Sequence, residues 1–178
     1  GAVFLRTFHR EFGLPATIFR FFNTYGPRQS EDFVLPRFVK AAMQGRALQV
    51  YGDGSQTRTF CYVDDTVDTC IMAHADSSCE NDVINVGSDM EISILDLAST
   101  VLRVTGSDSR IEFLPPLPEG DMSRRCPDIS KMHMLLKRPL VPLEEGIRRL
   151  VDYYVQRGMQ NGNGESDVSM AKVASRQG

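Results

Sequence analysis

The chain has 178 residues, of which 42% are hydrophobic and 24% charged, a composition typical of one soluble globular domain with its own core. Twenty Lys and Arg against 23 Asp and Glu give a net charge of −3, without the basic stripe that would attract nucleic acid. No apolar run approaches the roughly 20 residues needed to cross a bilayer, and the first residues lack the features of a secretory signal. We therefore expect a cytoplasmic protein that binds neither nucleic acid nor membrane.

The cysteines and histidines give no sign of a metal site. The chain has four cysteines and three histidines, and none of them falls in a C-x-x-C pair or in one of the usual zinc spacings. We expect isolated thiols and no bound metal. The cysteines are Cys61, Cys70, Cys79 and Cys126.

The first elements are a helix and a strand. Phe4, Phe8 and Phe12 recur at helical spacing, as in the later turns of a helix already under way, and a glycine at position 13 then supplies a stop. Residues 16–22 form a nearly continuous apolar run, which suits a strand buried on both faces, and residues 23–27 form a loop.

The next segment alternates between helix and strand. Apolar residues at helical spacing predict an amphipathic helix over 34–43, closed by Gly45. A short strand over 48–51 then enters a glycine-containing turn. Residues 57–63 alternate in character, which would place Arg58 beside Phe60 and Tyr62 on one face of an extended segment.

The second half continues the same alternation. Asp64 and Asp65 mark a helix start, and Val67, Ile71 and Ala75 follow at helical spacing. The later predicted elements are a strand at 83–86, a helix with a capping box at Ser93 and Asp96 that ends at Gly106, a strand at 111–114, a short helix capped by Asp128, and a last helix that begins near Pro142.

The periodic pattern stops near Gly158, and we expect residues 158–178 to be a disordered tail. Residues 1–157 alternate strands with helices, which favours an α/β fold with at least partly parallel pairing.

Four loop segments stand at strand ends or before helices, where α/β proteins bind ligands. They are residues 22–28, 50–58, 62–65 and 124–128. Each is weak evidence alone, since the Asn-x-x-Gly at Asn23 could simply be a turn.

Arginine in these loops is the strongest candidate for a binding role, because its planar fork can hold phosphate oxygens. Arg58 could meet a ligand anion or, equally well, pair with Asp64 or Asp65. Arg124 and Arg125 could simply be solvated, and Tyr51 could stack on a base or pack in the protein.

Two motifs are absent from the printed sequence. It has no glycine-rich G-x-x-G-x-x-G or G-x-G-x-x-G stretch after an opening strand. Such a turn lets the backbone and a helix N-terminus approach the pyrophosphate of a dinucleotide. It also has no Tyr followed four residues later by Lys, the pair that would supply a proton-transferring phenol. We therefore name no catalytic residue and expect this chain alone to be inactive.

Taken in order, the loop segments resemble the extended short-chain dehydrogenase/reductase family of nucleotide-sugar epimerases, dehydratases and decarboxylases. The resemblance covers about residues 9–157 and rests on PATIFRFFNTYGPRQ, VLPRFVKAAMQGRALQVYGDGSQTRTFCYVDDTVD, INVGSDMEISILDLASTV and RRCPDISKMHMLLKRPLVPLEEGIRRLVDYY. It implies the last strands and helices of a Rossmann-like parallel sheet plus a small α/β substrate-binding domain, that is, the carboxy-terminal portion of such an enzyme.

The resemblance also implies roles for named residues. Phe21 would lie near the nicotinamide of NAD, and Asn23 would touch the sugar diphosphate of a UDP- or dTDP-sugar substrate. Val50 and Tyr51 would flank the base, and Arg58 and Arg125 would clamp the phosphates, with Arg124 the less favoured of its pair. Full-length members are often homodimers, so a homodimer is implied for the full-length enzyme.

Several interpretations of this resemblance stay open. We favour a portion of a 4-epimerase-like enzyme that lacks its NAD-binding half, whereas a UDP-glucuronate decarboxylase or a dTDP-glucose 4,6-dehydratase would have a similar carboxy-terminal half. A non-catalytic nucleotide-sugar binding module and a decayed product without function are the alternatives of other classes.

Overall fold

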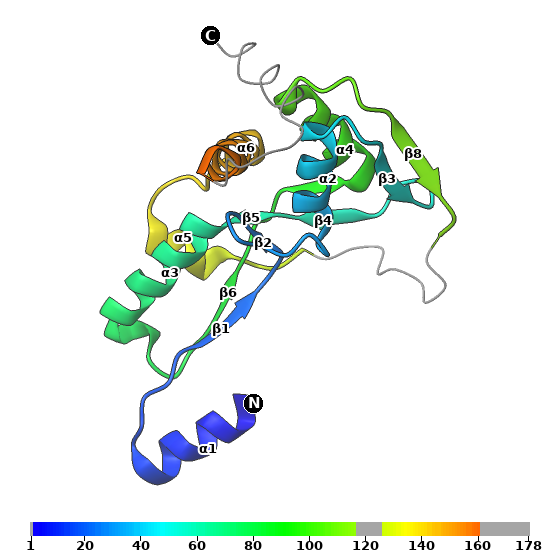
Figure 1. Ribbon diagram of the computed structural model, residues 1–178. Coiled ribbons are helices and arrows are strands. Elements are labelled where there is room, and N and C mark those ends of the chain that lie inside the picture. Colours follow the sequence, from blue (N-terminus) through cyan, green and yellow to red (C-terminus); the bar gives the residue numbers. More distant parts are fainter. Residues whose placement is uncertain (1, 117–125, 161–178) are drawn as a thin grey trace. The chain divides into compact units, whose positions relative to one another are not determined.

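The computed structural model describes residues 2–116 and 126–160. The chain forms two compact units (Figure 1). Unit 1 comprises Gly1–Thr24, Thr59–Met90 and Cys126–Val141, and unit 2 comprises Tyr25–Arg58, Glu91–Arg125 and Pro142–Gly178. Both units combine helices with parallel strand pairs, so the predicted α/β class is confirmed.

The centre of unit 1 is a parallel strand pair. Strand β1 (Ile18–Phe21) runs beside β6 (Val83–Val86), with Ile18 opposite Val83 and Phe21 opposite Val86. Because the strands are parallel, their carboxyl ends lie at the same edge, where loops of α/β proteins bind ligands. Two very short strands, β2 (Thr24–Tyr25) and β5 (Cys61–Tyr62), also contribute residues to this unit.

The helices of unit 1 differ in how much they bury. Helix α5 (Ser130–Leu136) packs on β6 and on α3 (Val63–Ala75), which leads into a 3₁₀ turn, η1 (Ser77–Cys79). The core of the unit is built from Cys61, Ala73, Cys79, Ile84, Val86, Ile129, Met132 and Leu136. Helix α1 (Ala2–Phe12) ends at Gly13 as predicted, with φ +68° at that glycine, but its phenylalanines are mostly exposed.

Unit 2 is built on three helices that pack against one another. They are α2 (Val34–Met43), α4 (Ile94–Thr105) and α6 (Leu143–Gln160). The strands of the unit form two pairs, β3 (Leu48–Tyr51) parallel to β8 (Ile111–Leu114), and β4 (Thr57–Thr59) beside β7 (Glu91–Ser93). The fully buried side chains of this core include Leu35, Phe38, Val39, Leu48, Val50, Leu97, Val101, Ile147 and Leu150.

Local chemistry fixes the ends of α4 as the sequence predicts. The Ser93 hydroxyl accepts a hydrogen bond from the backbone N–H of Asp96 at 3.0 Å, which satisfies a donor of the first turn. At the other end Gly106 adopts φ +63°, a conformation that costs glycine little. Asp128, which was predicted to cap the next helix, accepts from the Ser130 N–H at 2.9 Å, but the N-cap residue of α5 is Ile129.

Two expectations about elements were wrong. Strand β1 is not buried on both faces, because in the described residues it pairs with β6 alone and Phe21 is 57% exposed. Residues 57–63 do not form one strand. The extended segment breaks at Phe60, because β4 pairs with β7 whereas the Cys61 N–H bonds to Asn23 O at 3.2 Å.

The orientation of α3 was not predicted from the sequence. Its apolar residues Val67 and Ile71 face solvent, whereas Asp65, Thr66 and Thr69 are buried. The helix therefore turns its polar side inward, toward hydrogen-bond partners contributed by residues far along the chain.

Helix α6 continues to Gln160, beyond the Gly158 at which we expected the tail to begin. The remainder of the predicted tail, residues 161–178, lies outside the described residues.

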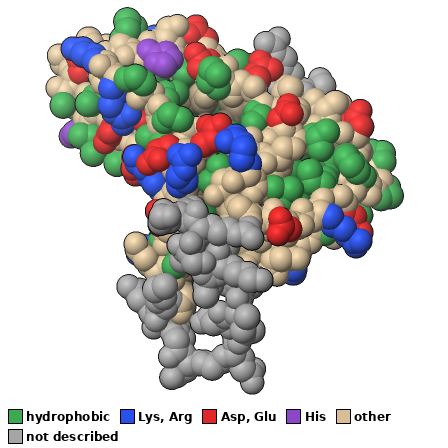
Figure 2. All heavy atoms as spheres, turned by 90° about the horizontal axis from the view of Figure 1, so that it is seen from above, with side chains coloured by type: hydrophobic (Ala, Val, Ile, Leu, Met, Phe, Trp, Pro, Cys, Tyr) green, Lys and Arg blue, Asp and Glu red, His purple; other side chains and the backbone are tan. Residues whose placement is uncertain are grey.

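The surface is mixed in charge. On the face shown in Figure 2, basic and acidic side chains are interspersed. No helix among the described residues is long and apolar enough to cross a membrane. Within the same residues, no cluster of three or more His, Cys, Asp or Glu could hold a metal ion, and the four cysteines are free thiols.

Candidate functional site

In unit 1, two predicted site residues lie at the carboxyl end of β1. Phe21 is the last residue of the strand, and its ring stacks against Phe19 with centroids 6.1 Å apart. Asn23 follows two residues later in the left-handed region, at φ 41°, which asparagine tolerates better than most residues. Phe21 is thus an exposed aromatic residue, and Asn23, two residues later in the chain, is half-buried.

A glycine at the end of β6 lets the loop after β1 approach closely. A Cβ atom on Gly87 would lie 2.9 Å from the Cβ of Phe22 and 3.1 Å from the Cγ of Pro127. Both contacts are closer than real Cβ atoms tolerate without movement, so a side chain at this position would push the loop away. The Phe22 N–H also bonds to Val86 O at 2.9 Å, which extends the strand pairing to the start of the Asn23 loop.

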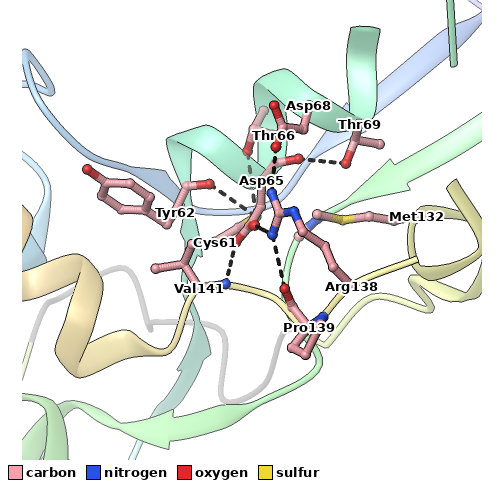
Figure 3. A network of polar contacts seen from close by, with 11 residues as sticks. Cys61, Tyr62, Asp65, Thr66, Asp68, Thr69, Met132, Arg138, Pro139 and Val141 are labelled. Atoms are coloured by element: carbon pink, nitrogen blue, oxygen red, sulfur yellow. Dashed lines mark hydrogen bonds and ion pairs between the residues drawn. The ribbon is translucent and has the colours of Figure 1, made fainter. Parts of the chain in front are cut away.

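A buried carboxylate ties α3 to the segment that follows α5 (Figure 3). Asp65 is fully buried and accepts hydrogen bonds from Arg138 Nη1 at 2.5 Å and from the Val141 N–H at 2.8 Å. The other arm of Arg138 reaches Asp68 at 2.6 Å. Hydrogen bonds to Asp68 and Asp65 raise the pKa of the Arg138 guanidinium, so the group stays charged.

The same turn of α3 reaches back toward the Asn23 loop. Thr66 Oγ1 lies 3.2 Å from Thr24 Oγ1 and 3.5 Å from Cys61 Sγ, and Cys61 in turn bonds to Asn23 O through its N–H. Burial raises the pKa of the Cys61 thiol to about 11, although the hydrogen bond between Cys61 and Thr66 opposes the shift. Cys61 is therefore an inert, protonated packing residue at neutral pH.

In unit 2, a glycine-containing turn joins the end of β3, where Tyr51 lies, to β4, which contains Arg58. Gly54 in this turn has φ +73°, and a Cβ there would lie 2.8 Å from Val50 Cγ1 and 3.1 Å from Leu95 Cβ. Only glycine fits both the conformation and the space. The side-chain amide of Gln56 donates to Tyr51 O at 3.2 Å and so holds the turn against the end of the strand.

The predicted base and phosphate residues differ in exposure. Val50 is fully buried, so its side chain contributes to the core of unit 2, whereas Tyr51 is partly exposed. Arg58 is partly buried, and its Nη1 donates to Thr57 O at 2.7 Å. Asp65, one of the two carboxylates that we weighed as an ion-pair partner for Arg58, is instead bonded to Arg138.

Arg37 is a candidate that the sequence analysis missed. Its guanidinium lies over the Tyr51 ring, 5.9 Å from the centroid, within the range of a cation–π contact. Its Nε is buried and has no hydrogen-bond partner among the described residues, which is costly for a charged group. The sequence does contain a feature that could have identified Arg37, because it is a cation within the apolar pattern of residues 34–43, between Leu35 and Phe38.

Comparison with known proteins gives the family. Residues 1–87 match the NAD dependent epimerase/dehydratase family. A UDP-N-acetyl-alpha-D-glucosaminuronate decarboxylase from Bacillus cytotoxicus is 40% identical over 151 residues, which is 80% of this chain and 47% of that protein. The chain belongs to the NAD dependent epimerase/dehydratase family. It spans about half the length of this relative.

Solved structures of the family share the fold. UDP-glucose 4-epimerase from Thermotoga maritima, solved with UDP-glucose, gives a TM-score of 0.80 at 31% identity and covers 88% of this chain and 51% of its own. UDP-glucuronic acid 4-epimerase from Bacillus cereus, solved with UDP-glucuronic acid and NAD, gives a TM-score of 0.75 at 34% identity. The match covers 85% of this chain and 49% of that protein. The Rossmann-like α/β architecture implied by the sequence is therefore confirmed.

Among the predicted site residues, the structure places Phe21 and Asn23 in unit 1 and Val50, Tyr51 and Arg58 in unit 2. Arg124 and Arg125 lie outside the described residues, so the second half of the predicted phosphate clamp has no structural description. In unit 1 both residues lie at or just after the end of β1, whereas in unit 2 Val50 and Tyr51 lie at the end of β3 and Arg58 lies in β4.

Proposed function

We propose that residues 1–157 are the nucleotide-sugar-binding portion of an NAD-dependent enzyme that acts on a UDP-linked uronic acid. The observation that carries this proposal is the 40% identity, over four fifths of the chain, with a decarboxylase whose name specifies a UDP-linked uronic acid. The solved 4-epimerase that is 34% identical was crystallised with another UDP-linked uronic acid. The substrate class is common to both relatives, although the reactions in their names differ.

The reaction that we favour remains 4-epimerase-like, with decarboxylation as the second candidate because of the decarboxylase just named. The two reactions are chemically close. Oxidation of a uronic acid at C4 places a ketone β to the carboxylate, and such a compound can lose CO₂ or regain hydride on either face. Small differences in how the sugar is held can thus decide between them. A dTDP-glucose 4,6-dehydratase and a non-catalytic binding module have less support from these relatives.

The proposed residue roles follow from what each side chain offers. Tyr51 presents an aromatic face for the uracil ring, backed by the Arg37 guanidinium. Arg58 supplies a fork of donors for the diphosphate, and Arg125 would supply a second. Val50, being buried, would act by fixing Tyr51 rather than through its own side chain. Asn23 offers an amide to the sugar diphosphate from a loop held by Cys61.

NAD, when bound, would accept hydride from the sugar. The fit of this chain to that cofactor rests on Phe21, because an exposed aromatic ring at the carboxyl end of a parallel strand suits contact with a flat nicotinamide. The glycine-rich turn and the Tyr-x-x-x-Lys pair are absent from the printed sequence. We therefore expect no turnover of UDP-glucuronic acid by this chain with added NAD, and release of CO₂ or a 4-epimer would contradict this expectation.

Calorimetric titration of the folded chain with UDP tests the proposal. We expect Arg58→Ala to weaken binding by about tenfold or more, because charge-assisted hydrogen bonds to phosphate are lost. Arg46→Ala is the matched control, since Arg46 is an exposed arginine of the same unit that bonds to Gln44. A folded wild-type chain that binds no UDP, or equal affinities for the two variants, would overturn the proposal. Dimerisation and a cytoplasmic location remain predictions from the sequence.

A further inference from the structure

Unit 2 contains a groove that none of the proposed nucleotide-sugar residues lines. It has a volume of about 1090 Å³ and lies along the last turns of α6, the middle of α2 and the loop before α2. The charged and aromatic residues that line it are Arg28, Glu31, Lys40, Tyr153, Tyr154 and Arg157. All of them belong to unit 2, so the groove is a property of that unit alone.

The lining of the groove carries an excess of positive charge. Three cations face one carboxylate, and that carboxylate, Glu31, forms an ion pair with Lys40. Among the described residues no carboxylate pairs with either Arg28 or Arg157. Two guanidinium groups are therefore available to an anion that enters the groove.

The aromatic side of the groove holds its cations in place. Arg157 Nη1 donates to the Tyr153 hydroxyl at 2.9 Å, which orients the guanidinium without neutralising it. Lys40 Nζ lies over the Tyr154 ring, 5.0 Å from the centroid, and the two tyrosine rings are 5.5 Å apart. Burial raises the pKa of Tyr154, and Glu31 adds to the shift, so this phenol stays protonated and able to donate a hydrogen bond at neutral pH.

The loop before α2, which also lines the groove, has an unusual backbone conformation. Arg28 has φ 69°, a left-handed conformation that is unfavourable for a residue with a Cβ. Such residues persist where the surrounding structure fixes them, and they are frequent at ligand sites.

We propose that this groove binds the phosphate group of a small phosphorylated molecule, held by the guanidinium groups of Arg28 and Arg157. Phosphate suits the site because arginine forks match its oxygens and a dianion gains from two cations. Glu31 opposes binding, since it adds a negative charge and occupies Lys40. The site is independent of the proposed nucleotide-sugar site, which uses Arg58.

The test is a titration of the full chain with inorganic phosphate, followed by the backbone amide NMR signals of residues 153–157. It is carried out with Arg58→Ala in every sample, which weakens phosphate binding at the proposed diphosphate site. We expect saturable shifts of these signals with a dissociation constant on the order of 1 mM, and no comparable shifts with acetate at equal ionic strength.

Variants separate this site from general charge effects. Arg28→Ala and Arg157→Ala should each weaken phosphate binding by about fivefold to tenfold, whereas Arg148→Ala, on α6 but outside the groove, should leave it unchanged. Glu31→Gln should tighten binding by about threefold, because one opposing charge is removed and Lys40 is released. A gain of affinity cannot come from misfolding.

Three results would overturn the proposal. They are the absence of saturable shifts in a folded sample, an equal loss of affinity in Arg148→Ala, and a failure of Glu31→Gln to tighten binding. None of them bears on UDP binding through Arg58, so the two proposals fail separately.

Discussion

The two units of this chain are stabilised in different ways. Unit 2 packs three amphipathic helices with their apolar faces inward, and its large exposed hydrophobic residues are few, chiefly Phe33 and Phe113. Unit 1 exposes apolar side chains on α1, on α3 and at the end of β1, and it buries the polar side of α3. A regular apolar stripe therefore predicts the inward face of a helix only when no polar partner competes for that face.

The largest effect should come from the helical core of unit 2. Phe38→Ala removes a fully buried ring from α2 and should lower the free energy of unfolding by about 3–5 kcal/mol. Phe33→Ala, at a residue that is 55% exposed in the same unit, should change it by less than about 0.5 kcal/mol. Urea denaturation of the two variants measures the difference. Similar losses would mean that the described core does not stabilise the unit.

In unit 1 the corresponding effect should come from a polar residue. Asp65→Ala should cost about 2–3 kcal/mol, because the Val141 N–H loses its buried acceptor and Arg138 keeps only the half-exposed Asp68 as a carboxylate partner. Asp68 binds the same arginine but is 44% exposed, so Asp68→Ala should cost only about 0–1 kcal/mol. Denaturation is also measured for Arg138→Ala and for the double variant Asp65→Ala/Arg138→Ala. Together with Asp65→Ala, these values give the coupling energy between Asp65 and Arg138. Equal costs for Asp65→Ala and Asp68→Ala would show that the network stabilises through surface charge alone.

The stability of the chain should also fall at alkaline pH, because the Cys61 thiol of unit 1 is buried. The Cys61 thiol has a folded-state pKa of about 11, above the ordinary value of 9.0, so the unfolded chain loses this proton first. The contribution of this thiol to the free energy of unfolding is fully present below about pH 9. It is lost as pH rises toward 11, which lowers the free energy of unfolding by up to about 2–3 kcal/mol. Unfolding measured from pH 8 to 11 should show a shallower decline in Cys61→Ala than in wild type. Cys126→Ala, at an exposed thiol, is the control, and identical slopes in all three proteins would remove Cys61 as the cause.

The smallest effect on stability should come from the exposed stripe of α3. Ile71 is 62% exposed, so Ile71→Gln should change the free energy of unfolding by less than about 0.5 kcal/mol. It should nevertheless reduce self-association at high concentration, since exposed apolar patches promote contact between molecules. Sedimentation velocity of wild type and variant measures this. A large loss of stability would place Ile71 in a core that the structure does not show.

The sequence predicted those elements whose signals are local. Ser93, Asp96 and Gly106 bound α4 through capping and a left-handed stop, and the structure has both. The turn that contains Gly54 was likewise predicted from its own glycines, and Gly54 there adopts φ +73°. These features depend on a few neighbouring residues, which a single sequence contains in full.

The features that the sequence did not predict depend on residues far apart in the chain. Helix α3 turns Asp65 inward because Arg138 and Val141, more than 70 residues away, supply its partners. The break at Phe60 reflects two different partner segments for the residues on either side. Arg37 was missed because its significance depends on the Tyr51 ring, which only the fold brings to it. The predicted site residues came from resemblance, and their roles remain proposals.

The most direct test of the central claim is amide hydrogen exchange of the full chain with and without UDP-glucuronic acid. If the chain is a nucleotide-sugar-binding portion as proposed, exchange should slow in residues 50–58 of unit 2 and in residues 21–24 of unit 1, while α1 is unaffected. A folded chain in which saturating ligand slows neither segment would contradict the claim.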